Sequence, residues 1–242
     1  MSKRTRRAGR SSFRAHGATA TDHGHPTAAT AGLSAVDAQA LLDRLLKGGG
    51  DAGDAELFRA AMLTEMAKMS CEDGMTMQIH PGAYRNHNVA LFAKYGPNVG
   101  ADIPMRTDYV SALKPLLDRV GNRADIAVIL FTLDETNYAR ELHRSPATIG
   151  PETRSGLVVL RLAGRHAAFP PPGDGNRRLL QHRRIQRRHP RLFLHSGAAR
   201  LARRIDAAYL AELVTSHRLE EDEAQDVIVD LAYNLPKAAY KL

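Results

Sequence analysis

The first polar cluster that could carry chemistry is Asp22-His23-Gly24-His25, near the start of the sequence. In an extended segment alternate side chains point to the same side, so His23 and His25 would face one side together. Two imidazoles arranged in this way suit a metal ion. A hydrogen-bonded loop fits the same residues, and composition alone favours the loop.

The second cluster is QIHPGAYRNHN, residues 78–88. His80 can bind a metal or transfer a proton, because imidazole changes its charge near neutral pH. Arg85 can bind a carboxylate through two parallel hydrogen bonds. A histidine and an arginine that only fix a loop would give the same sequence, so both interpretations stay open.

The third cluster is TLDETNY, residues 132–138, which follows the longest apolar run of the chain. Asp134 and Glu135 could contact a substrate there. They also fit the start of the next helix, where side-chain oxygens accept hydrogen bonds from free backbone N–H groups. Capping is the favoured interpretation.

Three expected strands lead into these clusters. Their sequences are ATATDHGH at residues 18–25, MTMQIH at residues 75–80 and DIAVILFTLDE at residues 125–135. The last is a continuous β-branched run, as expected for a parallel strand that is buried on both faces. In parallel α/β folds the chemistry lies at the carboxyl ends of the strands, which is where the clusters stand.

Helices are expected between these strands. Ser34 and Asp54 are suited to begin two of them, because both can cap a helix N-terminus. A third helix is expected from Thr107, with one face formed by Val110, Leu113, Leu117 and Val120 and a possible kink at Pro115. From residue 13 to residue 142, the alternation of strands and helices predicts a parallel α/β architecture.

Composition limits the class of protein. The chain has 242 residues, of which 43% are hydrophobic and 25% are charged, as in soluble globular proteins. Its single cysteine, Cys71, excludes an internal disulfide and fits a reducing compartment. The longest apolar run, which begins near Ile126, is too short to span a bilayer, and no signal-peptide core follows the N-terminus. We therefore expect a cytoplasmic protein.

The positive charge is concentrated in two places. The formal net charge is +8, yet residues 177–204 alone hold ten arginines and no acidic residue, and the first ten residues are also basic. The rest of the chain is therefore acidic. A nucleic-acid-binding protein that uses the 177–204 strip is the alternative function, and it predicts binding that weakens steeply with salt. The strip has Phe193 as its only aromatic residue for base stacking and no sustained apolar helix face, which speaks against this alternative.

The chain is expected to have four parts. Residues 1–12 form a basic and disordered tail, and residues 13–142 form βα units. Residues 143–200 are a low-order segment that is rich in arginine and proline. Residues 201–242 form C-terminal helices, one over residues 205–217 and one whose N-terminal turn is acidic and whose C-terminal end is basic, as the helix dipole favours.

The clusters, in this order, resemble the uronate (glucuronate) isomerase family of the amidohydrolase superfamily. The resemblance covers about residues 13–142 and 201–242. It is carried by ATATDHGHP, LTEMAKMSCEDGMTMQIHPGAYRNHN, GADIPMRTDYVSALKPLLDRVGN, ILFTLDETNYARELH and the C-terminal RRIDAAYLAELVTSHRLEEDEAQDVIVDLAYNLPKAAYKL. Members of this family are (β/α)₈ barrels that interconvert D-glucuronate and D-fructuronate, or galacturonate and tagaturonate. The resemblance implies a partial TIM barrel, from about its fourth strand onward.

The resemblance also implies roles for residues. His80 and Arg85 are expected to be catalytic, and Asp22, His23 and Arg85 are expected to bind the uronate substrate. The full-length family uses a divalent metal, expected to be zinc, for which His80 is a candidate ligand. The family's first-strand His-x-His metal pair is absent from this sequence, and we expect the metal not to be retained. A homo-oligomer or a complementary fragment is the expected protein partner.

Residues 143–200 depart from the family pattern, since the family's seventh and eighth strands should lie there. Neither a WWFFDSPEGMRRF-like segment nor a GFNDDTR-like motif is present. Permitted codons for residues 156–169, read one base later, spell AWWFFDSPEGMRRF, and those for residues 182–193 spell TVGFNDDTRAF. We therefore expect a shifted reading frame through about residues 143–200, and a chain that does not turn over as written.

Overall fold

The structure of the protein is a computed structural model that describes residues 3–97, 103–123, 125–137, 140–141, 157–159 and 192–242. These residues belong to two units, Met1–Val159 and Leu160–Leu242. Most of the segment expected to be of low order lies outside the described residues, as does the greater part of the arginine-rich 177–204 strip. None of the helices in the described ranges is long and apolar enough to cross a membrane.

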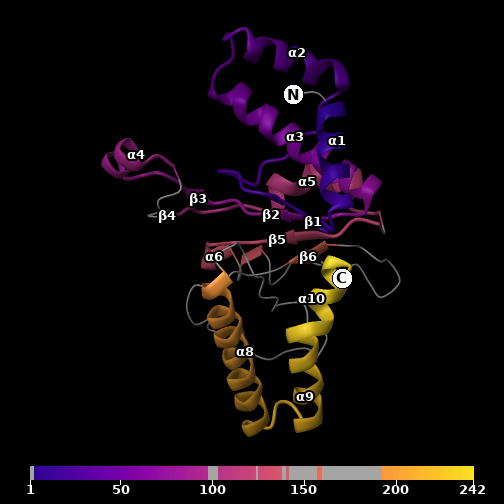
Figure 1. Cartoon of the computed structure of the whole chain (residues 1–242), viewed down its shortest axis with the longest axis vertical. Helices are drawn as coiled ribbons and strands as arrows, with labels where there is room; N and C mark the ends of the chain where they lie inside the picture. The colour runs from indigo at the N-terminus through magenta and orange to yellow at the C-terminus, as the bar shows by residue number, and fades with distance from the viewer. Residues whose placement is uncertain (1–2, 98–102, 124, 138–139, 142–156, 160–191) are drawn as a thin grey trace. The chain divides into compact units, whose positions relative to one another are not determined.

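The first unit is built on a four-stranded parallel sheet (Figure 1). Its strands are β1 (Ala20–His23), β2 (Thr76–Ile79), β5 (Val128–Leu130) and β6 (Leu157–Val159), in the order β1-β2-β5-β6. Every residue of β2 and β5 is buried. The predicted parallel α/β architecture is therefore confirmed, and β6 places a strand inside the segment for which low order was expected.

Helices cover one face of this sheet. They include the long α3 (Ala52–Asp73) and α5 (Val110–Val120), and α2 (Ala35–Leu46) packs against α3. Leu63 and Ala67 of α3 and Leu113 of α5 pack with strand residues such as Ile79 in one hydrophobic core. The core residues of the two helices recur every three or four positions, which is the spacing that places them on a single face.

The N-caps of α2 and α3 were predicted from capping residues in the sequence, one correctly and one wrongly. Ser34 is the N-cap of α2, as predicted, and its hydroxyl accepts a hydrogen bond from the backbone N–H of Asp37. The prediction that Asp54 caps α3 is wrong, because the N-cap is Asp51. Asp54 instead stands three positions into the helix and completes a capping box with Asp51.

Helix α5 begins later than predicted. It was expected from Thr107, but it starts at Val110, whose side chain is 66% exposed. The fully buried residues are Leu113, Leu116 and Val120, and Leu117 packs against the same core, so of the predicted face only Val110 lies outside. Two carboxylates satisfy the first free backbone N–H groups of the helix. Glu141 accepts from Tyr109 and Val110, and Asp108 accepts from Ser111.

Residues 3–12 are helical rather than disordered. They belong to α1 (Lys3–Ala15), which lies beside the C-terminal end of α3. Arg7 pairs with Glu72 through two hydrogen bonds, and Arg10 pairs with Asp73 in the same way. The basic residues that predicted a free tail are therefore the residues that anchor this helix.

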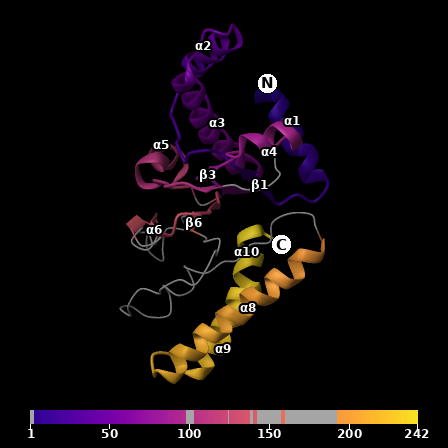
Figure 2. The same cartoon turned by 90° about the vertical axis from the view of Figure 1, so that its left-hand side faces the viewer.

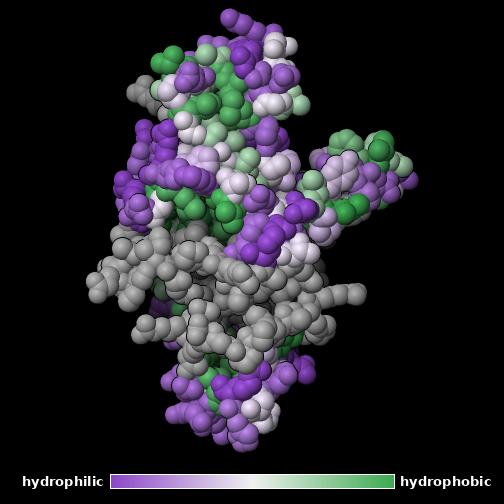
Figure 3. Space-filling view, turned by 180° about the vertical axis from the view of Figure 1, so that it is seen from behind, coloured by the Kyte–Doolittle hydropathy of each residue, from purple (hydrophilic) through white to green (hydrophobic). Residues whose placement is uncertain are grey.

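A hairpin arm projects from the first unit (Figure 1). It consists of β3 (Ala83–Tyr84), helix α4 (Val89–Tyr95) and β4 (Ile103–Pro104), which pairs antiparallel with β3. Hydrophobic side chains gather on this arm (Figure 3). Exposed ones are Tyr84, Val89, Phe92, Tyr95 and Ile103.

The second unit is helical. Helices α8 (Leu192–Thr215) and α9 (Glu221–Val229) form an antiparallel hairpin, and a π-helical turn (Asp230–Asn234) leads into α10 (Leu235–Tyr240) (Figures 1 and 2). The two predicted helices are confirmed, although α8 begins at residue 192, inside the segment expected to be of low order. The acidic start of α9 carries a capping box between Glu220 and Glu223. A small core holds the hairpin together through Leu210, Leu213, Leu219, Val227 and Leu231.

Candidate functional site

Asp22 and His80 meet at the carboxyl ends of two neighbouring strands. Strands β1 and β2 pair in parallel register, and the backbone N–H of His80 donates to the carbonyl of His23 at 2.8 Å, which extends the ladder by one residue. A carboxylate oxygen of Asp22 contacts Nδ1 of His80. The histidine is buried, whereas the Asp22 side chain is 39% exposed. The sheet therefore joins one residue from each of the first two predicted clusters.

The imidazole of His80 is neutral near pH 7. Burial, together with the Arg85 guanidinium, lowers the pKa of His80 from 6.5 to about 4. The contact with Asp22 is thus a hydrogen bond in which Nδ1–H donates to the carboxylate. This bond selects the tautomer whose lone pair is on Nε2, and it would stabilise the imidazolium that forms when Nε2 takes up a proton.

Phe131 holds the ring of His80 from one face. The two rings are stacked, with centroids 3.9 Å apart and planes 9° from parallel. Phe131 is itself 1% exposed, because it directly follows the buried strand β5. The orientation of His80 is therefore fixed both by a hydrogen bond and by a buried aromatic neighbour.

Arg85 passes close to the first cluster. Its Nη2 lies 3.3 Å from the position that a Cβ atom would occupy on Gly24. The arginine can approach this closely because Gly24 has no side chain. Arg85 is exposed, so its guanidinium is open to an anion from solvent.

His23 and His25 face the same side, as predicted. Their rings are stacked with centroids 6.4 Å apart. Nε2 of His23 is hydrogen-bonded to the hydroxyl of Thr21 at 3.0 Å. Burial, and then the charges of His25 and Arg10, lower the pKa of His23 to about 4. His23 is neutral at pH 7 and hydrogen-bonded, which agrees with the loop interpretation.

Asp134 has the capping role that the sequence favoured. Its Oδ1 accepts hydrogen bonds from the N–H and the hydroxyl of Thr136, in the short helix α6 (Glu135–Asn137). Its Oδ2 accepts from the N–H of Thr107 at 3.1 Å. Burial raises the pKa of Asp134, but these hydrogen bonds outweigh that effect and keep it below its ordinary value.

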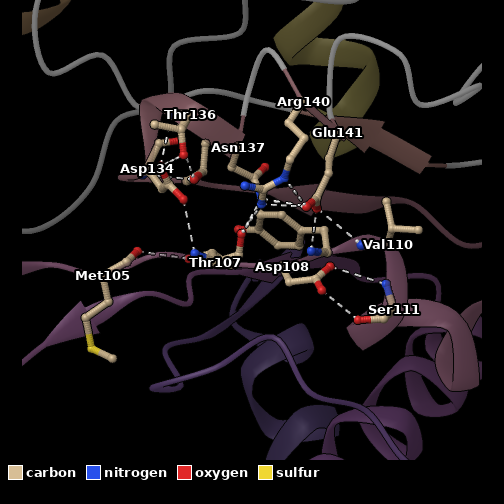
Figure 4. A network of polar contacts seen from close by, with 12 residues as sticks. Met105, Thr107, Asp108, Val110, Ser111, Asp134, Thr136, Asn137, Arg140 and Glu141 are labelled. Carbon is tan, nitrogen blue, oxygen red and sulfur yellow. Dashed lines mark hydrogen bonds and ion pairs between the residues drawn. The ribbon is translucent and has the colours of Figure 1, made fainter.

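A second polar network was missed from the sequence (Figure 4). Glu141 is buried, accepts a hydrogen bond from the N–H of Tyr109 at 2.7 Å, and pairs with Arg140 through two hydrogen bonds. Asn137 donates to the carbonyl of Thr107 at 2.6 Å. The four-residue spacing of Asn137 and Glu141 was visible as a helical pair, but their partners lie about 30 residues earlier and gave no signal.

A metal does not fit the described residues by themselves. Among them, no three His, Cys, Asp or Glu side chains come together as a metal site requires. Nδ1 of His80 already faces Asp22, and Nε2 of His23 faces Thr21. We therefore assign no chemical step to a metal at this site.

The residues of this site lie in a part of the chain that matches known proteins. A family model described as glucuronate isomerase matches residues 6–144. A uronate isomerase of Phenylobacterium zucineum (strain HLK1) is 53% identical over 96% of this chain and 49% of its own length. One of Xanthomonas axonopodis pv. citri (strain 306) is 51% identical over 99% of this chain and 51% of its own. The chain spans about half the length of the curated relatives that it matches.

Two solved structures have the same fold. The crystal structure of glucuronate isomerase from Caulobacter crescentus matches 98% of this chain and 50% of its own, with a TM-score of 0.85 and 44% identity. The uronate isomerase from Thermotoga maritima matches with a TM-score of 0.77 at 20% identity, and supports the fold alone. The family model covers more than half of the residues, and the site residues of β1 and β2 lie within the matched range. The chain belongs to the glucuronate isomerase family.

Proposed function

We propose that the chain is uronate isomerase-like and carries part of a site for aldose–ketose isomerisation, of D-glucuronate to D-fructuronate and of galacturonate to tagaturonate. One observation carries this proposal. A buried, neutral histidine, oriented by Asp22, lies at the carboxyl ends of parallel strands beside an exposed arginine. A uronate needs these two groups, because it presents a carboxylate at one end and a carbonyl that isomerises at the other.

Arg85 would bind the substrate carboxylate. Its guanidinium is open to solvent, and its approach to Gly24 directs it towards the strand ends that carry Asp22 and His23. A bidentate pair between a guanidinium and a carboxylate fixes the orientation of the substrate as well as adding affinity. The reacting carbons would then be held at a defined distance from His80.

His80 would move the proton. After ring opening, the proton on C2 is removed and the C1 carbonyl oxygen is protonated, which gives an enediol. The proton is then delivered to C1 while the O2 hydroxyl loses its own, which gives the ketose. Nε2 of a neutral His80 carries the lone pair that would accept and return such a proton. Protein atoms cover Nε2 in the structure, so the substrate has to uncover it on binding, and Asp22 would stabilise the cation in between.

The fold behind this site is proposed to be a partial (β/α)₈ barrel from about its fourth strand. The four parallel strands separated by helices, and the match to half of the Caulobacter chain, support this proposal. The absence of the family's seventh- and eighth-strand motifs from the sequence is proposed to result from a shifted reading frame over about residues 143–200. The family-model match ends at residue 144, next to the start of that segment. The nucleotide sequence of codons 140–205 tests this, since its shifted frame must spell AWWFFDSPEG and GFNDDTR.

We expect the chain as written not to turn over alone, because the residues of these two motifs are missing from its sequence. A complementary fragment, or a homo-oligomer, would have to supply partners for the site. Co-expression with the N-terminal half of a family member tests for a complex. Turnover of glucuronate by the purified chain alone at a rate of about 1 per second or more, as ordinary enzymes reach, would overturn the expectation of inactivity.

Binding of the substrate can be tested without turnover. Calorimetry should detect D-glucuronate but not neutral D-glucose, and Arg85→Gln should abolish the difference. Arg218→Gln, at an exposed position in the second unit, is the matched control and should bind glucuronate as the original chain does. Equal binding by Arg85→Gln and the original chain would show that Arg85 does not hold the carboxylate.

A further inference from the structure

We infer, on the basis of the proposed function, that the polar network centred on Glu141 positions both His80 and Arg85, with Tyr109 and Thr107 as its positioning residues. The network consists of Thr107, Tyr109, Asn137, Arg140 and Glu141, and Figure 4 shows its contacts. Two separate chains of contacts lead from it to the candidate site.

The buried Glu141 carboxylate is the centre of the network. One oxygen accepts two hydrogen bonds from Arg140, at 2.9 and 2.6 Å. The other accepts from the N–H of Tyr109 at 2.7 Å and from the side-chain amide of Asn137 at 3.2 Å. Charge-assisted hydrogen bonds of this kind are short and directional, so the backbone at Tyr109 is held in place.

The first chain of contacts runs from Tyr109 to His80. The Tyr109 hydroxyl donates to the carbonyl of Phe131 at 2.5 Å. Burial raises the pKa of Tyr109, so the hydroxyl stays protonated and remains a donor. Phe131 in turn stacks on the ring of His80 at 3.9 Å. Movement of Tyr109 would therefore be transmitted to the imidazole through Phe131, whose carbonyl accepts from Tyr109 and whose ring stacks on His80.

The second chain of contacts runs from Thr107 to Arg85. The backbone of Thr107 is held on both sides, since its N–H donates to Asp134 and its carbonyl accepts from Asn137. The Thr107 hydroxyl lies where a side chain on Gly82 would have to be. The carbonyl of Gly82 accepts from the N–H of Met105 at 2.8 Å, and Gly82 has a left-handed φ of +84°.

Gly82 lies between the two site residues, His80 and Arg85, in the sequence. It lies two residues after His80 and three before Arg85, so its conformation sets the direction in which the chain leaves β2. Its left-handed conformation and its contact with Thr107 both require a glycine. Neither Thr107 nor Tyr109 contacts the exposed groups that would meet a substrate, and so both are positioning residues rather than catalytic ones.

The variant Tyr109→Phe, made in the full-length chain, tests the contacts that lead from Tyr109 to His80. It keeps the ring in the core and removes only the hydroxyl. We expect the NMR signals of the His80 ring protons to lose part of the upfield shift that stacking on Phe131 causes, and the affinity for D-glucuronate to fall about fivefold, as for one lost hydrogen bond. Tyr95→Phe, at an exposed position on the arm, is the matched control and should change neither signal.

Gly82→Ala tests the second chain of contacts. Its matched control is Gly96→Ala, because Gly96 has a similar φ of +77° but nothing within 4 Å of an added Cβ. Both variants carry the cost of a side chain in left-handed backbone, and only Gly82→Ala displaces Thr107. We expect Gly82→Ala to shift the NMR signals of the His80 ring and to weaken glucuronate binding by more than tenfold, while Gly96→Ala changes neither.

The outcomes separate the inference from the proposed function. If the original chain does not prefer glucuronate to glucose, the proposed function fails, and the His80 signals in Tyr109→Phe and Gly82→Ala still decide whether the network positions that ring. Unchanged His80 signals in both folded variants would overturn the inference. If Tyr109→Phe fails to fold, the comparison of Gly82→Ala with Gly96→Ala decides it, and equal His80 signals in those two variants count against it.

Discussion

Arg10 and Asp73, which are 63 residues apart in the sequence, form a two-pronged ion pair with N–O distances of 2.5 and 2.9 Å. The Arg10 guanidinium is almost fully buried and also donates to the hydroxyl of Ser70 at 3.0 Å. The pair joins the first helix of the chain to the end of α3, directly before strand β2. It therefore connects the N-terminal segment to the strand that carries His80.

Arg10→Ala should lower the free energy of unfolding by about 2–3 kcal/mol, because it leaves a partly buried carboxylate without its partner. Arg7→Ala is the control, because it removes a similar ion pair that is more exposed to solvent. Arg7 and Glu72 are both about half exposed, so its loss should cost less than about 1 kcal/mol. Urea denaturation of the two variants measures the difference, and equal losses would contradict the role given to burial.

The Arg10–Asp73 pair should also weaken in acid. Burial raises the pKa of Asp73. The hydrogen bonds from Arg10 and from the N–H of Met75 outweigh this effect, so the pKa of Asp73 lies below its ordinary value. A carboxyl with a lowered pKa stabilises the folded state above the pKa of the unfolded chain, about 4, and this contribution is lost as the pH falls through the folded value. Arg10→Ala should therefore destabilise less at about pH 3 than at about pH 7.

Stability should fall between about pH 7 and pH 4 for a second reason. The pKa of His80 is lowered from 6.5 to about 4 by burial, so the unfolded chain binds a proton in this range and the folded chain does not. The loss from His80 is at most about 3 kcal/mol. Urea denaturation at several pH values should show a smaller slope for His80→Gln, and an identical slope would mean that His80 does not titrate in this way.

Gly24→Ala should weaken D-glucuronate binding about twofold without unfolding the protein. The added methyl group would stand 3.3 Å from Nη2 of Arg85, a tight contact that the guanidinium relieves by a small shift. Gly9→Ala is the control, since nothing lies within 4 Å of its added Cβ. Because Gly9 is inside helix α1, that substitution should stabilise slightly and leave binding unchanged.

Glu141→Gln should lower the free energy of unfolding by about 1–2 kcal/mol, because a charge-assisted cap of α5 and the Arg140 pair both lose their charge. Asp118→Asn, on the exposed side of the same helix, breaks the exposed pair with Lys114 and should cost less than about 0.5 kcal/mol. Thermal unfolding followed by circular dichroism compares the two. Similar melting temperatures would contradict the capping role of Glu141.

The parts of the fold that follow from local pattern were predictable. The buried run of β5 and the cap of α2 at Ser34 are specified by nearby residues, and both occur as expected. The meeting of the first two clusters followed from a general rule, since consecutive strands of a βαβ unit tend to pair and their carboxyl ends then share one edge. Which atoms meet was not predictable, because the contact of Asp22 with His80 depends on strand register.

Features that depend on distant partners were not predictable. The basic N-terminal segment has no carboxylate nearby in the sequence and so resembled a free tail, whereas its partners Glu72 and Asp73 belong to α3. The start of α5 was misplaced for the same reason. Asp108 accepts from Ser111 nearby, but the N–H groups of Tyr109 and Val110 donate to Glu141, about 30 positions later.

The parallel pairing of β1 with β2 has a consequence for how the protein folds. Helices α2 and α3 lie between these strands in the sequence, so the chain must close a long loop before Asp22 can meet His80. Closing this loop lowers the conformational entropy of the chain before any contact between the strands stabilises it. Parallel pairing is therefore slow compared with helix formation. The Asp22–His80 contact should appear among the last events of folding, after α2 and α3 are helical. During refolding, the appearance of the NMR signal of the stacked His80 ring should therefore mark the time at which the first unit has finished folding.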